Sequence, residues 1–423
     1  MTERTIIVGA GLAGLSAAYE LAQAGHNIQV FEAQQRLGGR VHTVQMESGQ
    51  YGNLGAEFVD DNHTAVMAYA TQFDLKLDPA CQFPDDLYWF SDGILRNWND
   101  FTTEQENALD DFYTQLSNAI EQQSDPLQTL EQWMDSHQIT PFVRRLARVQ
   151  SRGLYAIDAD SIGVGFFAQY GSTGNSNMRI RGGSSQLVNA LVGQVKERIG
   201  LGTPVRRIQQ TDNTVTVSVE TANGLEAVVA DNVIVAIPWS ALRHIPLEFP
   251  LSEAHRAAIL ELPYGSLVKT LVQYPDRFWT QANFGIQLLE SDYQAIWEPT
   301  FTQVGKQKIL CCYSGGRPSL TLGERAIDKA QQTVHTLYPH APEAIACRSY
   351  DWNTDRWAKG GYCYFAPGQL DRFNPHLTLP AGRVFFAGEH TAPVEYRGYM
   401  EGAVRSGIRA AQQILNMGAR NEE

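Results

Sequence analysis

"RTIIVGAGLAGLSAAYELAQAGHNIQVFEAQQRLGGR", residues 4–40, is the stretch that decides the fold. An apolar run ends in the pattern Gly9-x-Gly11-x-x-Gly14. Apolar side chains at three- and four-residue spacing then predict a helix over 12–24, and a second short apolar run follows it. The order strand, glycine turn, helix, strand predicts the first βαβ unit of a Rossmann-like α/β domain with parallel strands.

The glycine pattern indicates a dinucleotide cradle. Gly9 makes the tight turn, Gly11 lets the backbone approach a pyrophosphate, and Gly14 lets the helix pack close to the strand. The free N–H groups and the positive dipole end of the helix favour phosphates. Glu32 ends the second strand 18 residues after Gly14, where its carboxylate can accept hydrogen bonds from ribose hydroxyls. This placement favours a cofactor without a 2′-phosphate.

A second glycine pair follows the acid. Gly38-Gly39-Arg40 again lets the backbone crowd a cofactor, and an arginine can pair with phosphate oxygens. The run from Glu32 to Arg40, E-A-x-x-R-x-G-G-R, resembles the flavin amine oxidase family, whose cofactor is FAD. The resemblance covers nearly the whole chain.

Further motifs carry the resemblance along the chain. They are LGAEFV (54–59), IRGGSSQLVNAL (180–191), LGTPVRRI (201–208), GSLVKTLVQY (265–274), DWNTDRWAKGGYCYFAPG (351–368) and FFAGEHTAPVEYRGYMEGAVRSGIRAA (385–411). The resemblance implies that FAD contacts Gly9, Gly11, Ala13, Gly14, Glu32, Ala33, Gly38, Gly39, Arg40, Gly55, Ala56, Glu57, Phe58, Val205, Trp352, Gly388, Glu389, Gly398 and Met400.

Some of these positions have specific roles in the family. By the resemblance, the backbone of Val205 touches adenine, Glu389 holds the ribityl hydroxyls, and Trp352 packs on the edge of the isoalloxazine. Gly398 lets that ring approach. Met400 begins a helix whose first N–H groups can bond the pyrimidine carbonyl as negative charge grows there.

Three residues are expected to be catalytic: Lys269, Tyr399 and Tyr362. The strand with Lys269 allows two interpretations, because on an alternating strand the lysine could equally face solvent. The resemblance favours an active-site lysine that holds a water near flavin N5. Tyr399 resembles an aromatic wall in front of the flavin, and either Tyr362 or Tyr364 forms the opposite wall.

The expected FAD is non-covalent. Monoamine oxidases carry a flavin-linked cysteine directly after the glycine pair of this motif, whereas this chain has Tyr362 there and Cys363 one step later. The implied reaction is hydride transfer from the α-carbon of a neutral amine to flavin N5, imine hydrolysis, and reduction of O2 to hydrogen peroxide. Non-amine flavin chemistry and a non-enzymatic FAD-binding module are the alternatives from other classes.

Substrate choice depends on weaker features. From Glu57 to Asp111 the chain has thirteen acidic and two basic side chains, a local net charge of −11. This favours a di- or polyamine, with Asp60 and Asp61 as partners of its distal ammonium and Trp357 near the substrate. A solvated acidic surface is the plain alternative. An L-amino acid oxidase is the other alternative, in which Arg96, Arg179 or Arg181 would meet the carboxylate.

Composition limits the remaining possibilities. The 423 residues have a net charge of −13, which disfavours nucleic acid as a partner, and no stretch is apolar enough to span a membrane. The five cysteines show no metal-ligand spacing. With an N-terminus that lacks a leader pattern, they favour reduced thiols and a cytoplasmic protein.

The chain is expected to form two interleaved domains. Residues 1–75, 178–255 and 352–423 are predicted to build the FAD-binding domain. Residues 76–177, which look helix-rich, and 256–351 are predicted to build an α+β substrate-binding domain.

Overall fold

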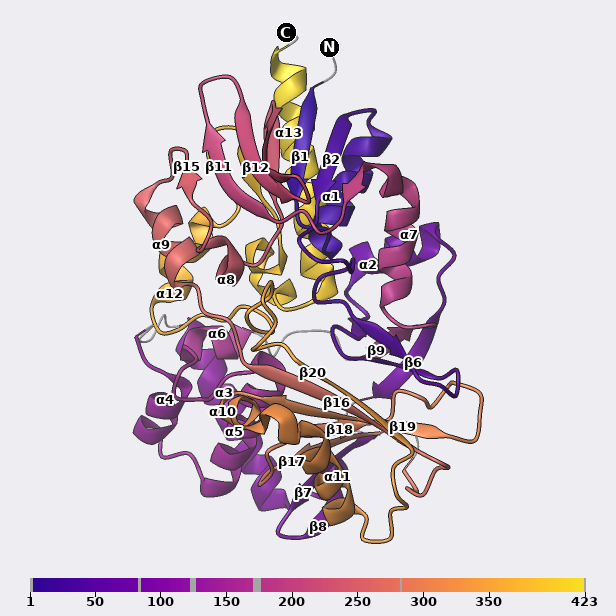
Figure 1. The fold of residues 1–423 in the computed structure, drawn as a ribbon. Helices are drawn as coiled ribbons and strands as arrows, with labels where there is room; N and C mark the ends of the chain where they lie inside the picture. The colour runs from indigo at the N-terminus through magenta and orange to yellow at the C-terminus, as the bar shows by residue number, and fades with distance from the viewer. Residues whose placement is uncertain (1–2, 83–84, 122–126, 170–175, 282–283, 422–423) are drawn as a thin grey trace.

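The computed structural model describes residues 3–82, 85–121, 127–169, 176–281 and 284–421. Figure 1 shows two lobes one above the other, with both chain ends together at the top of the upper lobe. The chain passes between the lobes several times, so each lobe is assembled from segments that are distant in the sequence.

The centre of the upper lobe is a five-stranded parallel sheet. Its strand order is β10 (Ile199–Gly200), β2 (Asn27–Phe31), β1 (Arg4–Val8), β14 (Asn232–Val235) and β21 (Val384–Phe386). Helices α1 (Leu12–Gln23), α7 (Ser185–Val195) and α13 (Met400–Asn421) pack with it around one apolar core. A Cβ at Gly407 of α13 would lie 2.2 Å from the carbonyl oxygen of Ala13. Glycine therefore permits the close packing of α1 on α13.

Smaller sheets flank this core. One of them is a four-stranded sheet with the strand order β13 (Gly224–Ala230), β12 (Val215–Thr221), β11 (Val205–Gln210) and β15 (Leu247–Glu248). Strands β5 (Phe58–Asp60), β9 (Ser176–Ile180) and β6 (Leu77–Gln82) form another, and β3 (Thr43–Gln45) pairs with β4 (Tyr51–Asn53). The upper lobe also includes α2 (Thr64–Gln72), α8 (Trp239–Leu242), α9 (Glu253–Glu261) and α12 (Gln369–Phe373).

The lower lobe is built on a seven-stranded sheet. Its order is β20 (Ala346–Asp351), β16 (Leu267–Tyr274), β19 (Lys308–Gly315), β18 (Ala295–Trp297), β17 (Gly285–Leu288), β7 (Leu87–Ser91) and β8 (Ile94–Asn97). One face packs its apolar side chains against α11 (Ala326–Leu337) and the end of α10 (Arg317–Leu322). The other face points to the helices α3 (Thr103–Glu121), α4 (Leu130–Ser136), α5 (Pro141–Tyr155) and α6 (Val164–Gln169), and to the space between the lobes.

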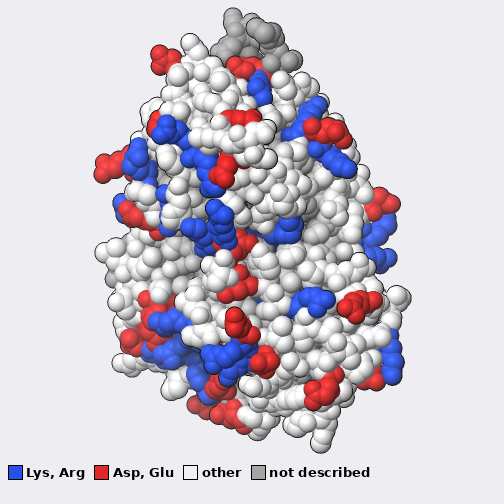
Figure 2. Space-filling model, in the orientation of Figure 1, with Lys and Arg blue, Asp and Glu red and all other residues white. Residues whose placement is uncertain are grey.

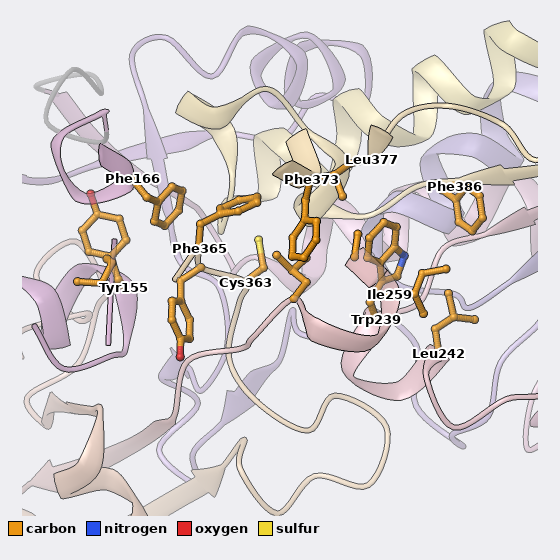
Figure 3. Close-up of a cluster of buried hydrophobic side chains, with 14 of the residues drawn as sticks. Tyr155, Phe166, Trp239, Leu242, Ile259, Cys363, Phe365, Phe373, Leu377 and Phe386 are labelled. Atoms are coloured by element: carbon orange, nitrogen blue, oxygen red, sulfur yellow. The ribbon is translucent and has the colours of Figure 1, made fainter. Parts of the chain in front are cut away.

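One apolar cluster crosses from lobe to lobe. Figure 3 shows it running from Tyr155 and Phe166 of the lower lobe through Phe365 and Cys363 to Trp239 and Phe386 of the upper lobe. The buried apolar area of this cluster fixes the two lobes together.

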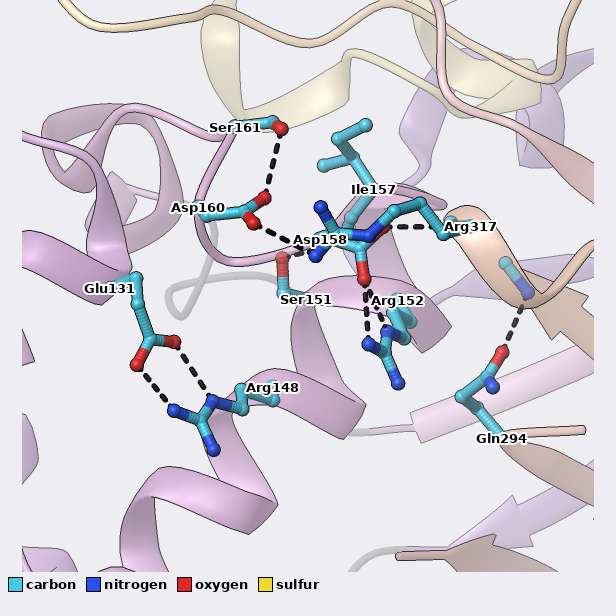
Figure 4. A network of polar contacts seen from close by, with 12 residues as sticks. Glu131, Arg148, Ser151, Arg152, Ile157, Asp158, Asp160, Ser161, Gln294 and Arg317 are labelled. Atoms are coloured by element: carbon cyan, nitrogen blue, oxygen red, sulfur yellow. Dashed lines mark hydrogen bonds and ion pairs between the residues drawn. The ribbon is translucent and has the colours of Figure 1, made fainter. Parts of the chain in front are cut away.

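Polar contacts hold α5 to α10 through Asp158. The carboxylate of Asp158 accepts a hydrogen bond from Arg152 Nε at 2.7 Å and another from the backbone N–H of Arg317 at 2.8 Å (Figure 4). Basic and acidic side chains alternate over the face in Figure 2, without a large area of one sign. No helix within the described ranges is both long and apolar enough to cross a membrane.

The observed fold class is the one predicted from the sequence, an α/β fold with a Rossmann-like domain. The expected first strand, the helix from residue 12 and the second strand are all present. The 76–177 segment is less helical than expected, because it contains β6, β7 and β8 before α3. The strands β7 and β8 are joined by Asp92-Gly93, both with positive φ, which is the dipeptide of a tight hairpin. The exact domain limits stay a prediction.

Candidate active site

A cavity of about 610 Å³ lies between the lobes. On the upper-lobe side it is lined by the glycine turn and the ends of the parallel strands, which is where parallel sheets bind ligands. On the lower-lobe side it is lined by the open face of the seven-stranded sheet and by residues 149, 150, 153 and 154 of α5. The size falls within the range of small-molecule and cofactor sites.

The glycine turn has the geometry of a phosphate cradle. A Cβ at Gly11 would meet nothing within 4 Å, so this position opens into the cavity. A Cβ at Gly14 would lie 2.0 Å from the carbonyl oxygen of Gly9, so glycine there permits α1 to approach the strand. Gly9 itself has φ +100°, a conformation that favours glycine. Each of the three positions therefore requires glycine for a different structural reason.

Glu32 lies beside the cradle at the end of β2. Its carboxylate accepts hydrogen bonds from the backbone N–H of Ala10 and of Gln34, both at 2.8 Å. Burial raises the pKa of Glu32, and these two N–H groups work against that rise. The bonds fix the carboxylate where it lines the cavity.

Arg40 and Glu389 both line the cavity and form a largely buried ion pair in its wall. The distance from Arg40 Nη1 to Glu389 Oε1 is 2.7 Å, and Arg40 also donates to the carbonyl of Gly361 at 2.8 Å. Glu389 accepts further bonds from the backbone N–H groups of Cys363 at 3.2 Å and Gly398 at 2.9 Å. Burial raises the pKa of Glu389, but Arg40 and these donors outweigh burial and hold it at about 2. The pair therefore joins the Gly38–Arg40 turn to the C-terminal turn before α13.

We expect Glu389→Gln to lower the free energy of unfolding by about 3 kcal/mol at pH 7, because it leaves the guanidinium of Arg40 buried without its anion. The folded pKa lies below the unfolded value of 4.5, so the carboxylate stabilises the fold above pH 4.5. That contribution is lost as the pH falls toward 2. Urea unfolding of both proteins should show a difference at pH 7 that narrows at pH 3.

The control is Glu261→Gln, whose carboxylate pairs with Arg372 on the surface with both side chains about half exposed. It should change stability by less than about 1 kcal/mol. An equal loss at pH 7 and pH 3 for Glu389→Gln would contradict the assigned ion pair.

Lys269 faces the cavity and is buried. Its ammonium donates to Glu57 Oε2 at 3.0 Å and to the carbonyl of Gly55 at 3.1 Å, and it lies 4.9 Å from the ring centroid of Trp297. Of its three N–H donors, two are thus engaged by the protein. The solvent-facing interpretation of this strand is therefore wrong, because every residue of β16 is buried.

Glu57 holds three donors at once. Besides Lys269, its carboxylate accepts from Arg179 Nε and from Trp297 Nε1, both at 2.9 Å. Burial raises the pKa of Glu57, but Lys269 and Arg179 together bring it below the usual range. Two cations and one anion thus form a buried cluster with one net positive charge at the cavity wall.

Three tyrosines line the same cavity, and two of them, Tyr362 and Tyr399, were predicted from the sequence. Tyr362 and Tyr399 both contribute to its wall, and the Tyr362 hydroxyl lies 2.7 Å from that of Tyr313. Tyr364 instead packs in the apolar cluster between the lobes and does not line the cavity. The choice between the two candidate walls therefore falls on Tyr362.

Comparison with known proteins agrees with this geometry. Residues 12–415 match the family model of flavin-containing amine oxidoreductases. The chain belongs to this family. This flavin-containing amine oxidoreductase is 27% identical over 454 residues to L-amino acid oxidase Bs29 of Bothriechis schlegelii, a match that covers 97% of this chain and 90% of the relative.

Solved structures share its fold. A redesigned double mutant of putrescine oxidase superposes with a TM-score of 0.88 at 20% identity, covering 98% of this chain and 99% of that one. Cyclohexylamine oxidase from Brevibacterium oxydans IH-35A superposes with a TM-score of 0.87 at 24% identity, covering 99% of both chains.

The cofactor of this amine oxidoreductase is FAD, and its residues fit that group. The open position at Gly11, the Glu32 carboxylate and the N-terminus of α13 at Met400 all face the one cavity. No cysteine is among the described residues that line it. Cys363 is buried and does not line the cavity, and its Sγ donates to Glu389 Oε2 at 3.3 Å, which agrees with non-covalent binding.

Most of the predicted site residues of the oxidoreductase line the cavity. These are Gly9, Gly11, Ala13, Glu32, Ala33, Gly38, Gly39, Arg40, Gly55, Ala56, Glu57, Phe58, Val205, Lys269, Trp352, Trp357, Tyr362, Gly388, Glu389, Gly398, Tyr399 and Met400. The guanidinium groups of Arg206 and Arg356 lie 5.9 Å and 4.7 Å from the ring centroid of Trp357. Trp357 therefore lies next to β11, whose Val205 is expected to touch adenine.

Asp60 and Asp61 do not line the cavity, in contrast to the expectation that they contact substrate. Asp60 is buried in a local turn, where its backbone N–H donates to His63 Nδ1 at 3.0 Å and its carboxylate lies 3.6 Å from Nε2 of the same ring. The His63 ring packs edge-on against Tyr399 at 4.9 Å, which places this pair behind the wall. Asp61 is exposed.

Several lining residues were missed from the sequence. Trp297 and Tyr313 form part of the wall, and Gln287 and Ala295 lie beside them. Their strands carry no motif, and only the successive pairing of β16 with β19, of β19 with β18 and of β18 with β17 brings them to Lys269.

Proposed function

We propose that this enzyme oxidises primary or secondary amines that bind with the nitrogen uncharged and carry a largely apolar body. The observation that supports this most is the state of the cavity carboxylates. The described acidic residues that line the cavity are Glu32, Glu57 and Glu389, and each already accepts hydrogen bonds from protein groups. A second positive charge on the substrate thus has no uncommitted carboxylate there.

Much of the lower-lobe wall is apolar or aromatic. Leu87, Ile286, Ile296, Trp297 and Tyr313 line it from the seven-stranded sheet. Burying an apolar amine body against these side chains is favourable at about 25 cal/mol per Å².

Bound FAD would supply the hydride acceptor for amine oxidation, and dioxygen would take up the two electrons to give hydrogen peroxide. The chain's own residues position the amine. Tyr362, held by its hydroxyl contact to Tyr313, and Tyr399 orient the nitrogen lone pair and exclude bulk water. Burial raises the pKa of Tyr362 and of Tyr313 well above the ordinary value, so both stay neutral phenols. Lys269 holds a water near the reacting atoms with its remaining N–H.

Turnover should rise with pH, because only the neutral amine has a lone pair to assist hydride loss. The fraction of neutral amine increases as the pH approaches the pKa of the amine, and the two phenols stay protonated over this range. We expect kcat/KM for cyclohexylamine to rise about tenfold per pH unit between pH 6 and 8. A flat profile from pH 6 to 10 would contradict binding of the neutral form.

A substrate panel tests the proposal directly. The purified yellow protein is mixed anaerobically with heptylamine, cyclohexylamine, putrescine or L-leucine, and flavin bleaching is followed. We expect the two monoamines to bleach the flavin at least about tenfold faster than putrescine or L-leucine. Each of the latter two would bring one additional charge into the cavity without a partner for it. A flavin that stays oxidised with every amine would reject the proposed function.

An L-amino acid is the second candidate, favoured by the relatives named L-amino acid oxidases. The di- or polyamine expected from the acidic segment is the third arm of the same panel, with putrescine as its probe. Four described cysteines, Cys311, Cys312, Cys347 and Cys363, are free thiols, which supports the proposed cytoplasmic location.

A further inference from the structure

Four cavity residues form one row across the seven-stranded sheet. Lys269 pairs with Tyr313, Tyr313 with Ala295, and Ala295 with Gln287, on the adjacent strands β16, β19, β18 and β17. Side chains of directly opposite residues share a face of the sheet, and all four line the cavity. Since neighbouring strands lie about 4.8 Å apart, the backbone of Gln287 is roughly 10 Å from that of Tyr313.

Gln287 is the glutamine of this wall that the protein does not engage. Neither end of its amide has a hydrogen-bond partner among the described residues, and its enclosed Oε1 is a buried acceptor without a donor. Gln294, by contrast, accepts from the backbone N–H of Gly315 at 2.7 Å and donates to two carbonyls. The Oε1 of Gln150, on the opposite wall, accepts from the Tyr113 hydroxyl at 2.9 Å.

The cavity-lining neighbours of Gln287 carry no donor for it. Trp89 lies opposite Gln287 on β7, but its indole N–H makes no hydrogen bond to the amide. Ala295 beside it in the row has only a methyl group, and Leu87, Ile286 and Ile296 are apolar. A polar group in an apolar wall is costly unless a hydrogen bond compensates it. The last torsion of a glutamine is broad, so the amide can turn its oxygen to a ligand in the cavity.

We propose that Gln287 selects amines that carry an uncharged hydrogen-bond donor, a hydroxyl or an amide N–H, at the end remote from the reacting nitrogen. This inference rests on the proposed function. The tyrosines and Lys269 define the reacting end of the row, Ala295 leaves room for an apolar spacer, and Gln287 receives the far end. The donor is uncharged because Gln287 offers a neutral carbonyl and the described carboxylates of the cavity are all engaged.

The test compares three amines of similar length: 6-aminohexan-1-ol, heptylamine and 1,6-diaminohexane. The protein variants are wild type, Gln287→Met and Gln332→Met, the last on the exposed surface of α11 as the matched control. In wild type and the control, kcat/KM for the amino alcohol should exceed that for heptylamine by about tenfold, the effect of one hydrogen bond in a dry site. In Gln287→Met the ratio should fall to about one, with FAD content unchanged.

A binding measurement separates selection from turnover. Calorimetric titration of the FAD-loaded protein with hexane-1,6-diol and heptan-1-ol, which carry no amine, should show the same preference for the second hydroxyl and its loss in Gln287→Met.

Equal constants for amino alcohol and heptylamine in wild type, or an unchanged ratio in Gln287→Met, would overturn the assignment of Gln287. If wild type oxidises 1,6-diaminohexane fastest and Gln287→Met loses this preference, the claim that Gln287 selects an uncharged donor would be overturned. Absence of bleaching by any amine would instead reject the proposed function, while the diol titration would still report on Gln287.

Discussion

Gly11→Val should give a folded protein that holds no FAD. The position opens into the cavity with no atom within 4 Å of a Cβ, so valine fits the fold, and its φ of −73° is ordinary for any residue. The added methyl groups fill the space where the backbone would approach the pyrophosphate. We expect the purified variant to be colourless, with a melting temperature within a few degrees of the wild-type apoprotein, as measured by absorbance at 450 nm and thermal unfolding.

Gly14→Ala is the matched contrast from the same turn. Its Cβ would lie 2.0 Å from the Gly9 carbonyl oxygen and 3.3 Å from the Ala236 Cβ, so α1 must move away from the sheet. We expect about 3 kcal/mol or more of destabilisation. A Gly11→Val protein that stays yellow, or a Gly14→Ala protein as stable as wild type, would refute the phosphate cradle.

The second large effect is expected at the Glu57 cluster. Lys269→Met should lower kcat/KM at least about 100-fold, as loss of a preorganised donor at a reacting centre does. Stability should change little, because Glu57 keeps Arg179 and Trp297 as donors. Glu57→Gln should instead cost about 3–5 kcal/mol of unfolding free energy, because it leaves two buried cations without their anion.

The double variant distinguishes charge from packing. Removing Lys269 as well should recover part of the stability lost in Glu57→Gln, since only one cation then lacks its anion. Lys308→Met is the control: that lysine lies on β19 and its ammonium donates to two backbone carbonyls, those of Thr300 and Gln303. Urea unfolding and steady-state rates give both readouts. Additive losses in the double variant would show that the cluster is not coupled through charge.

The cofactor half of the site could be predicted because its signals are local. The turn from Gly9 to Gly14 and the acid at Glu32 lie within one βαβ unit, where each residue type answers a backbone requirement. Glu389 and Met400 were placed by the family resemblance, and both line the cavity.

The substrate half could not be predicted, because it depends on strand register. Glu57 and Lys269 are 212 positions apart, and no local pattern links them. The row from Lys269 to Gln287 exists only through the pairing of four strands, in which a slip of one residue would turn every side chain to the other face. The hairpin at Asp92-Gly93, by contrast, had a recognisable turn dipeptide between apolar runs and was overlooked.

Charge density alone was misleading for Asp60. Its burial in the turn with His63 raises its pKa to about 7, with Asp61 adding to the rise, whereas the acidic segment had suggested solvated carboxylates that attract cations. A count of charges along a segment carries no information about which of them face a cavity.

The order of strands in the parallel sheet has a consequence during synthesis on the ribosome. β14 pairs with β1 on one side, but its other side is covered by β21, which is made about 150 residues later. Until then the nascent chain presents the uncovered edge of a strand whose four residues are all buried in the finished fold, the kind of surface that chaperones protect from aggregation. Glu389 and the start of α13 emerge later still, so the vitamin-derived prosthetic group can be captured only after translation is nearly finished.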